Sequence, residues 1–422
     1  MSHYRPTHSE LQAAHLSFVD NDLSKQKLVE VLLNDQSYHI EFNGHLTNHN
    51  KHAVIALSGL GASQERIKSF YDNYAIRTPY GYSLETAKMS KHVITQDNWQ
   101  LYLGKRTSFS SYCQFFDQQE KELGMDELLK RYVPILLPGW AGAFTHATIH
   151  LGWALDANSR WMTIEGLAYQ AFSYVSCHPE KTFSAMLGGS THPSILDSLL
   201  HIAGLWERDP FEFHNWVETL CSEKNCNMSD GIHPELVRSG LQYRIAKLLT
   251  EGHPLIYTSS AWIEDQDIST IWEQLYYAIA LLYLAQPGDF VILHLITALH
   301  AMEQIAIRMP AKQQKYAVKC FWIGMLCILF SRGEFPKKTA LEALNSTYKN
   351  SVDAGGIPYE KPEWEETITR AISEEEEHNP KMVYVLRRRW ELSGYRSIFR
   401  IAATHFTTTP ELPKSFETPP TE

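Results

Sequence analysis

Two histidines lie four residues apart inside an otherwise apolar stretch of the chain. The stretch covers residues 143–156, AFTHATIHLGWALD, and contains His146 and His150. Residues i and i+4 of a helix lie on the same face, and the neighbours on this face, Trp153 and Ala154, are apolar. We therefore predict that the face points into a core, where an unpaired polar group is costly. Histidines in such a place are hydrogen-bonded, take part in chemistry or bind a metal.

The apolar pattern of the whole chain predicts an all-α protein. The 422 residues are 44% hydrophobic and 20% charged, a globular composition. Helical periodicity is long and clear at 268–285, 290–308 and 312–330, whereas alternating strand patterns and fixed repeats are scarce. A helix is also predicted over 98–116, and the segment 332–362 is predicted to be irregular. We expect one large helical domain over residues 1–405, with the site between helices, and a disordered Thr/Pro/Glu-rich tail over 406–422.

Charge and cysteine usage exclude several classes of protein. The net charge of −10 disfavours a nucleic-acid partner. The most apolar run, 317–330, is too short to cross a membrane and contains Lys319, so no membrane partner is expected. The six cysteines form no CxxC pair, which argues against a disulfide framework or a zinc knuckle. The first residues lack an apolar signal core, and the expected location is the cytoplasm.

Two further histidines stand beside or within apolar helices. His294 is part of the run FVILHLITALHAM, and helical spacing places it on one face with Thr297 and Ala301. Taken alone, such a histidine is more often a hydrogen-bonded core residue than a ligand. His49 directly precedes an apolar helix that starts near residue 53, and there the simpler interpretation is a helix cap made by Asn48 or Asn50.

The segment after four consecutive glutamates carries a histidine and an unusual lysine. His378 follows the glutamates, and Asn379-Pro380 is typical of an N-cap and first helical residue. Lys381 is then predicted in the first helical turn, where a cation opposes the helix dipole. In one interpretation the glutamates neutralise Lys381 on a solvated surface. In the other, Lys381 carries a CO₂ adduct, an anion that a helix N-terminus favours.

These pieces, taken in order, resemble the questin oxidase family. The resemblance covers about residues 40–403 and rests on the following motifs: NHNKHAVIAL at 48–57, DNWQLYLGK at 97–105, FTHATIHLGWA at 144–154, HLIT at 294–297 and HNPK at 378–381. It implies a mostly helical oxygenase that acts with O₂ on an aromatic polyketide or anthraquinone-type phenol. The expected reaction is ring cleavage or Baeyer–Villiger-like oxygen insertion.

The resemblance also implies a non-haem Fe(II) site built from four histidines and a carboxylated lysine. The implied metal ligands are His49, His146, His294, His378 and Lys381. It further places His52, His150 and Thr297 next to the ligands or in the substrate pocket, with His52 or His150 as acid or base. Imidazole suits iron, zinc, copper and nickel, so the residues alone do not choose the metal.

Three alternatives stay open at the level of sequence. An NADPH-dependent monooxygenase without metal would need a dinucleotide fingerprint, and the segment SGLGAS at 58–63 lacks the third glycine. A metal-dependent hydrolase would also use a carbamylated lysine, but its usual HxH motif is not visible. The third alternative is a helical binding protein whose histidines are merely buried. Substrate identity and oligomeric state are not fixed by the sequence.

Overall fold

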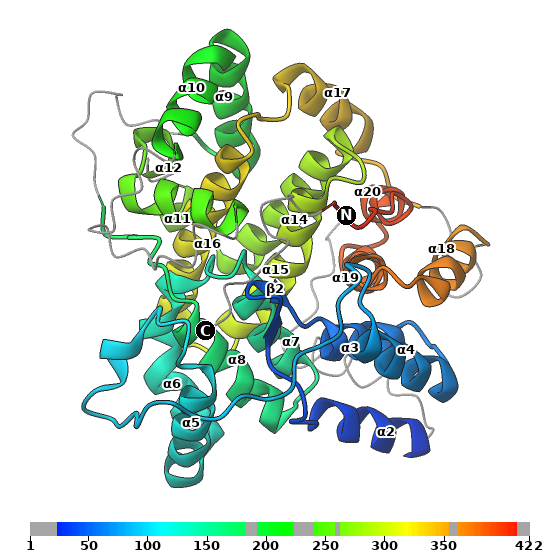
Figure 1. Cartoon of the computed structure of the whole chain (residues 1–422). Helices are drawn as coiled ribbons and strands as arrows, with labels where there is room; N and C mark the ends of the chain where they lie inside the picture. Colours follow the sequence, from blue (N-terminus) through cyan, green and yellow to red (C-terminus); the bar gives the residue numbers. More distant parts are fainter. Residues whose placement is uncertain (1–22, 182–191, 223–239, 258–261, 354–361, 412–422) are drawn as a thin grey trace.

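Helices make up nearly all of the regular structure, as the sequence predicts (Figure 1). The computed structural model describes residues 23–181, 192–222, 240–257, 262–353 and 362–411. Within these residues the strands are limited to β1 (Glu41–Phe42) and β2 (Leu46–Thr47), which pair as an antiparallel hairpin. The all-α prediction is confirmed.

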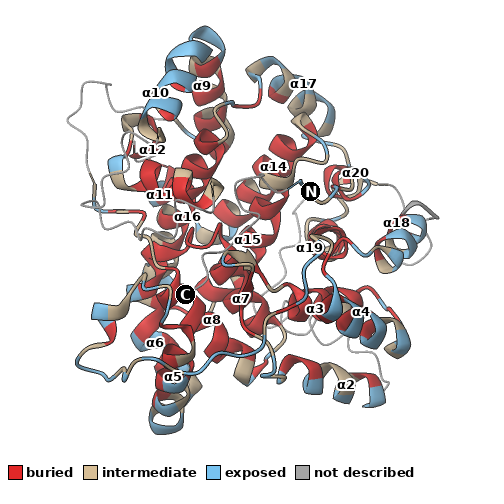
Figure 2. Ribbon diagram, in the orientation of Figure 1, coloured by how far each residue is buried: buried red, intermediate tan, exposed pale blue. Residues whose placement is uncertain are grey.

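Four helices surround the centre of the molecule: α3 (Asn50–Gly59), α7 (His146–Asp156), α15 (Phe290–Ala306) and α19 (His378–Leu392). They contact one another in the pairs α3–α7, α7–α15, α15–α19 and α19–α3. Every residue of α7 is buried, and Figure 2 shows the same for most of α3 and α15. The prediction that the His146–His150 face points into a core is therefore confirmed.

The remaining helices pack around these four and enclose them. Their bounds are α2 (Leu23–Leu33), α4 (Gln64–Ile76), η1 (Trp99–Tyr102), α5 (Phe109–Leu123), α6 (Met125–Leu136), η2 (Leu137–Gly139), α8 (Arg160–Phe172), α9 (Ile195–Arg208), α10 (Pro210–Leu220), α11 (Leu241–Glu251), α12 (Pro254–Tyr257), α13 (Trp262–Asp265), α14 (Ile268–Ala285), α16 (Ala311–Ser331), α17 (Lys338–Tyr348), α18 (Pro362–Ser373) and α20 (Ser397–Ala403).

A glycine permits the closest helix contact at the centre. A Cβ atom on Gly152 of α7 would lie 2.3 Å from the Cα and carbonyl oxygen of Ala301 on α15. Backbone atoms do not move aside as a flexible side chain does, so these two helices approach closely only because residue 152 lacks a side chain. His146 and His294 lie on the same two helices.

A buried polar cluster joins three of the four central helices. Asp156, at the end of α7, is 1% exposed and accepts hydrogen bonds from Tyr384 (2.8 Å) and Arg388 (2.8 Å) of α19. His300 of α15 lies 3.2 Å from the same carboxylate. A buried carboxylate is tolerated only when its hydrogen bonds are made, so this cluster fixes the positions of α7, α15 and α19 relative to one another.

Two predicted segments differ in the structure. The helix predicted over 98–116 is divided into η1 and α5 by a turn at Gly104, whose φ is +75°. The segment 332–362, predicted to be irregular, contains α17. This helix buries only Leu341, so the apolar periodicity that would reveal it is weak.

The chain stays packed beyond the predicted start of the tail at residue 406. Thr407 is buried, its N–H donates to Asn379 (2.9 Å), and its carbonyl accepts from the same amide (3.1 Å). These hydrogen bonds order the segment against the first turn of α19, so the tail prediction is wrong for residues near 407. Residues 412–422 lie outside the described part of the chain.

The helices of the described ranges do not have the character of membrane-spanning segments. None of these helices combines the length and the hydropathy that crossing a bilayer requires.

Gly152→Ala tests the close contact between α7 and α15. We expect a loss of about 1–3 kcal/mol in the free energy of unfolding, because the new methyl group collides with the Ala301 backbone. Gly204→Ala on α9 is the matched control, since its Cβ would meet only the flexible Lys338 side chain at 3.3 Å. The higher helix propensity of alanine should leave that variant unchanged or more stable. Denaturant unfolding measures both, and equal effects would contradict the packing argument.

Candidate metal centre

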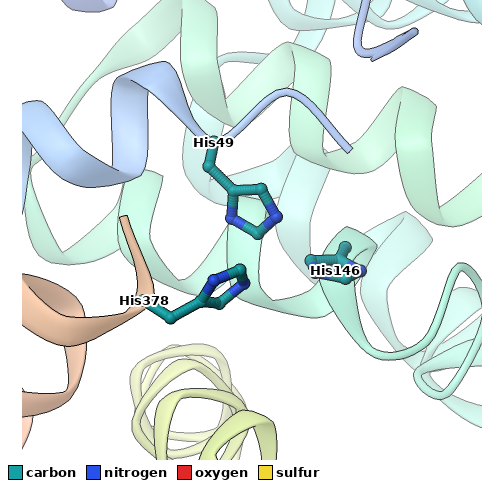
Figure 3. A group of neighbouring side chains, drawn as sticks. All are labelled: His49, His146 and His378. Atoms are coloured by element: carbon teal, nitrogen blue, oxygen red, sulfur yellow. The ribbon is translucent and has the colours of Figure 1, made fainter. Parts of the chain in front are cut away.

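Three histidines from distant parts of the chain converge at the middle of the four helices. His49 is the N-cap of α3, and His146 and His378 are the first residues of α7 and α19. Their candidate ligand atoms all lie within 4.8 Å of one another, and Figure 3 shows the rings facing a common space. His294 of α15 adjoins this group, with its ring centroid 4.8 Å from that of His146 and 4.7 Å from that of His378.

The hydrogen bonds of His146 and His294 determine which ring nitrogen carries the proton. Nδ1 of His146 lies 2.7 Å from the carbonyl of Ala143, and Nδ1 of His294 lies 2.7 Å from the carbonyl of Phe290. A carbonyl only accepts, so both Nδ1 atoms are donors, and in a neutral imidazole Nε2 is then unprotonated. The two Nε2 atoms lie 3.0 Å apart, so two lone pairs face each other.

Protonation does not relieve this arrangement. Burial, followed by the charge of Lys381, lowers the pKa of His146 well below its usual value. Burial and the neighbouring His378 do the same to the pKa of His294. A metal cation between the Nε2 atoms would turn the repulsion into coordination, and metal-bound histidines commonly anchor the other ring nitrogen on a backbone carbonyl. The residues therefore fit a metal ion.

His378 shows the same pattern with a carboxylate as its anchor. Its Nδ1 makes a very short hydrogen bond to Glu376. Its Nε2 is buried and has no hydrogen-bond partner among the described residues. A carboxylate that orients a histidine toward a metal is a recurrent arrangement. Thr409 in turn donates to the other oxygen of Glu376.

Lys381 is completely buried beside His49. Its Nζ lies 2.7 Å from Nδ1 of His49, and both side chains come from the walls of the same space. Burial lowers the pKa of Lys381 to about 7, although Glu377 and Glu376 raise it in part. The interpretation of a solvated surface lysine is therefore wrong. The predicted cap is also displaced, because α19 begins at His378 and its N-cap is Glu377.

The backbone before His146 adopts a rare conformation. Ala143, Phe144 and Thr145 have φ values of +49°, +50° and +69°. Each such residue costs about 1–2 kcal/mol when it is not glycine. Three in succession turn the Ala143 carbonyl back toward the His146 ring. Strained backbone is found at functional sites, and the sequence contained no glycine at these positions that would have revealed it.

The other two predicted histidines form a separate chain of hydrogen bonds. Nε2 of His52 lies 3.0 Å from Nδ1 of His150, and Nε2 of His150 lies 3.3 Å from Glu165. Glu165 also accepts from Lys51 at 2.6 Å. The Lys51 charge and these hydrogen bonds outweigh burial and lower the pKa of Glu165, so its carboxylate is ionised and only accepts. His150 then donates from Nε2, and His52 donates from Nε2 to His150.

The tautomer of His52 leaves a base next to the cluster. Because its proton is on Nε2, its Nδ1 carries a lone pair, and this atom is buried without a hydrogen-bond partner in the described chain. The His52 ring centroid lies 5.5 Å from that of His49. The hydroxyl of Thr297, in contrast, donates to the carbonyl of His294 in the same helix at 3.1 Å, so its proton is occupied within α15.

Sequence reasoning missed the residues that anchor the histidines. Glu376 belongs to the run of four glutamates, which looks like a solvated surface until the fold buries Glu376 and Glu377. Glu165 lies inside α8 with no motif around it. Near the start of α3, the side chain of Asn48 accepts a hydrogen bond from the N–H of Asn50 (3.0 Å). His49 is the N-cap residue, and its ring makes no capping hydrogen bond.

The family of the chain follows from comparison with known proteins. A model of the questin oxidase-like family matches residues 46–386. The chain belongs to this family. A similar curated protein, the Baeyer–Villiger oxidase AgnL3 of Paecilomyces divaricatus, is 25% identical over 138 residues. The match covers 29% of this chain and 28% of that relative. The family match contains the four central histidines and Lys381, and the resemblance inferred from the motifs is confirmed.

The glycine-rich segment 58–63 does not have the context of a dinucleotide fingerprint. It joins the end of α3 to Ser63, the N-cap of α4, whereas the fingerprint needs a strand before the glycines. A Cβ atom on Gly59 would lie 2.4 Å from the Tyr384 ring, so this glycine serves helix packing.

His146→Ala tests whether the cluster binds metal. We expect metal affinity to fall at least about tenfold, since even the residues that orient ligands contribute about 10–100-fold. Helical circular dichroism should stay largely intact. His201→Ala, an exposed histidine of α9, is the control and should keep its metal. Plasma mass spectrometry after dialysis measures the metal content per chain of each variant. If the parent protein holds no metal and the His146→Ala variant unfolds, the histidines serve only as buried core residues.

Proposed function

We propose that the protein is a non-haem iron-dependent oxygenase that acts with O₂ on an aromatic polyketide or anthraquinone-type phenol. The observation that carries the proposal is that Nε2 of His146 and Nε2 of His294 lie 3.0 Å apart in a buried site while both Nδ1 atoms face backbone carbonyls. Membership of the questin oxidase-like family and similarity to a Baeyer–Villiger oxidase support an oxidoreductase of polyketides. Ring cleavage and oxygen insertion are both compatible with this site.

Five side chains would hold the metal: His49, His146, His294, His378 and Lys381. When bound, iron would supply the one-electron chemistry that O₂ needs to react with a closed-shell organic molecule. Neutral imidazoles suit iron as well as zinc or copper. Nδ1 anchors on Ala143, Phe290 and Glu376 keep three of the rings turned toward the common space whether or not the ion is present.

Lys381 would contribute as a carbamate. Its neutral amine attacks CO₂: an N–C bond forms, one C=O π bond of CO₂ breaks to leave the carboxylate, and the nitrogen loses one proton, which is released to water. Only the neutral amine is nucleophilic, and a pKa of about 7 makes a large neutral fraction available near neutral pH. The carbamate places an anionic oxygen donor where an ammonium group would repel a metal cation. The fraction of modified lysine is expected to rise as the pH increases through 7.

His52 would take the proton of the phenol. Its Nδ1 lone pair is the available base, and an electron-rich phenolate reacts more readily than the phenol. When Nδ1 accepts a proton, Nε2–H passes its proton to His150, and His150 passes its own to Glu165. Beyond Glu165 a small cavity of about 10 Å³, lined in part by Asp35 and Tyr71, has room for about one water molecule.

Lys381→Ala tests the carbamate together with the oxygenase function. We expect O₂ uptake with a hydroxyanthraquinone to fall at least tenfold, because an anionic ligand is lost. Acetate or propionate added with bicarbonate should restore part of the uptake by supplying a carboxylate in the empty space. Lys51 pairs with Glu165 and is therefore unsuitable as a control. The control is Lys68→Ala, on the exposed face of α4. Full activity of the plain Lys381→Ala variant would exclude the carbamate.

The same assay separates the alternatives. Turnover that needs NADPH in a metal-free preparation would favour a nicotinamide-dependent monooxygenase. Turnover that continues without O₂ would favour a hydrolase. About one iron per chain together with O₂ consumption would support the oxygenase.

Glu165→Gln tests the proton route independently of the metal. We expect turnover to fall about 10²-fold, the lower range for loss of acid–base assistance, while the metal content stays unchanged. The pH profile of turnover should change as well, because His150 loses its ionised acceptor. The single variant leaves the buried Lys51 charge unpaired, so the double variant Lys51→Gln/Glu165→Gln, which removes both charges, is measured as well. Glu127→Gln, at an exposed position of α6, is the control. An unchanged pH profile in both Glu165 variants would contradict the route.

A further inference from the structure

The chain after α20 contacts the starts of two helices that carry candidate metal ligands. Residues 405–409 make these contacts and are called the strap below. α15 begins at Phe290 and carries His294, and α19 begins with His378. The strap lies beyond residue 386, where the family match ends, so its role has to be read from its contacts.

Thr407 ties the two helix starts together. It is buried, and its Oγ1 donates to the carbonyl of Gly288, two residues before α15, at 2.8 Å. Its backbone exchanges two hydrogen bonds with the side chain of Asn379, the second residue of α19, at 2.9 and 3.1 Å. One residue of the strap therefore links the helix that carries His294 to the helix that carries His378.

Thr409 reaches the histidine cluster through a carboxylate. Its hydroxyl donates to Oε2 of Glu376, while Oε1 of that carboxylate accepts from Nδ1 of His378 and, at 3.3 Å, from the His378 backbone N–H. Both oxygens are thus engaged, which restrains rotation of the carboxylate. The His378 ring that bonds to it keeps its Nε2 turned toward the space shared with His49 and His146 (Figure 3).

The strap is held by further contacts along its length. The hydroxyl of Tyr283 on α14 donates to the carbonyl of His405. The Arg370 guanidinium of α18 lies 3.9 Å from the ring centroid of Phe406, within the range of a cation–π contact. The strap is therefore anchored on α14 and α18 as well as on the two ligand-bearing helices.

We propose that Thr407 and Thr409 are positioning residues of the metal centre. Thr409 aligns His378 through Glu376, and Thr407 holds the start of α19 against that of α15. A ligand that is held in place before the ion arrives loses less conformational freedom on binding, so both hydroxyls contribute to metal affinity. The inference rests on the metal centre of the proposed function, and it does not depend on the substrate or on O₂ chemistry.

Titration of the full chain with Co²⁺, after a chelator has removed any bound metal, tests the proposal through the visible absorption of the bound ion. We expect Thr409→Val to weaken Co²⁺ binding about tenfold, the lower end of the range for residues that orient ligands. Thr409→Ser keeps the hydroxyl and should bind as the parent does. Thr407→Val removes the hydrogen bond to Gly288 and should also weaken binding. The helical circular dichroism of the metal-free variants should match that of the parent.

Thr404→Val is the matched control. This exposed threonine lies directly before the strap, and its hydroxyl donates to the carbonyl of Ile401 in α20 at 2.8 Å, so its loss should leave Co²⁺ affinity unchanged. If Thr409→Val fails to fold, Thr409→Ala at the same half-buried position replaces it.

Three results would overturn the role of the strap while leaving the metal centre intact. They are Co²⁺ binding as tight as the parent's in the variants that lack the Thr407 or the Thr409 hydroxyl, weak binding that Thr409→Ser does not restore, and equal weakening by Thr404→Val. A parent chain that binds neither Co²⁺ nor Fe(II) would overturn the metal centre and the role of the strap together.

Discussion

The central constraint in this protein is the burial of two imidazole nitrogens whose lone pairs face each other. Nε2 of His146 and Nε2 of His294 lie 3.0 Å apart, and burial lowers the pKa of both rings. The carbonyls of Ala143 and Phe290 impose this state by accepting the Nδ1 protons. The left-handed backbone before His146 places the Ala143 carbonyl within hydrogen-bond distance of Nδ1 of His146. A metal ion bound here, as proposed above, would resolve the electrostatic conflict that these contacts create.

Such a centre needs rigid surroundings, because a repulsive pair would separate if the helices could slide. Gly152 lets α7 and α15 touch at the backbone, and Asp156 ties the far end of α7 to α15 and α19. The buried carboxylates Glu376 and Glu165 each orient one histidine. Polar groups that would destabilise an ordinary core are thus stabilised by one another, and the free energy released by burying the surrounding apolar side chains offsets the cost of their desolvation.

The short β1–β2 hairpin lies between the histidine cluster and Arg106. Glu41 of β1 forms a buried ion pair with Arg106, and His49 follows β2 by two residues. Tyr169 joins the two strands, since its hydroxyl bonds both to Glu41 (2.9 Å) and to Thr47 (2.7 Å).

The sequence by itself determined the helical fold and the identity of the central histidines. Apolar periodicity places His146 and His294 on buried helix faces, because the pattern depends only on local geometry. The motifs identified the family, and with it His49, His378 and Lys381 as candidates. The sequence did not predict the surface helix α17, because a helix with one buried residue, Leu341, has little apolar periodicity.

Only the tertiary structure decided how these side chains are used. His52 and His150 are as prominent in sequence as the central four, yet they pair with each other and with Glu165 instead of facing His294. Lys381 changes from a plausible surface cation to a buried amine because α19, which carries it, packs against α3. Protonation states depend on partners and on burial, and both arise from contacts between residues far apart in the chain, which a local pattern does not contain.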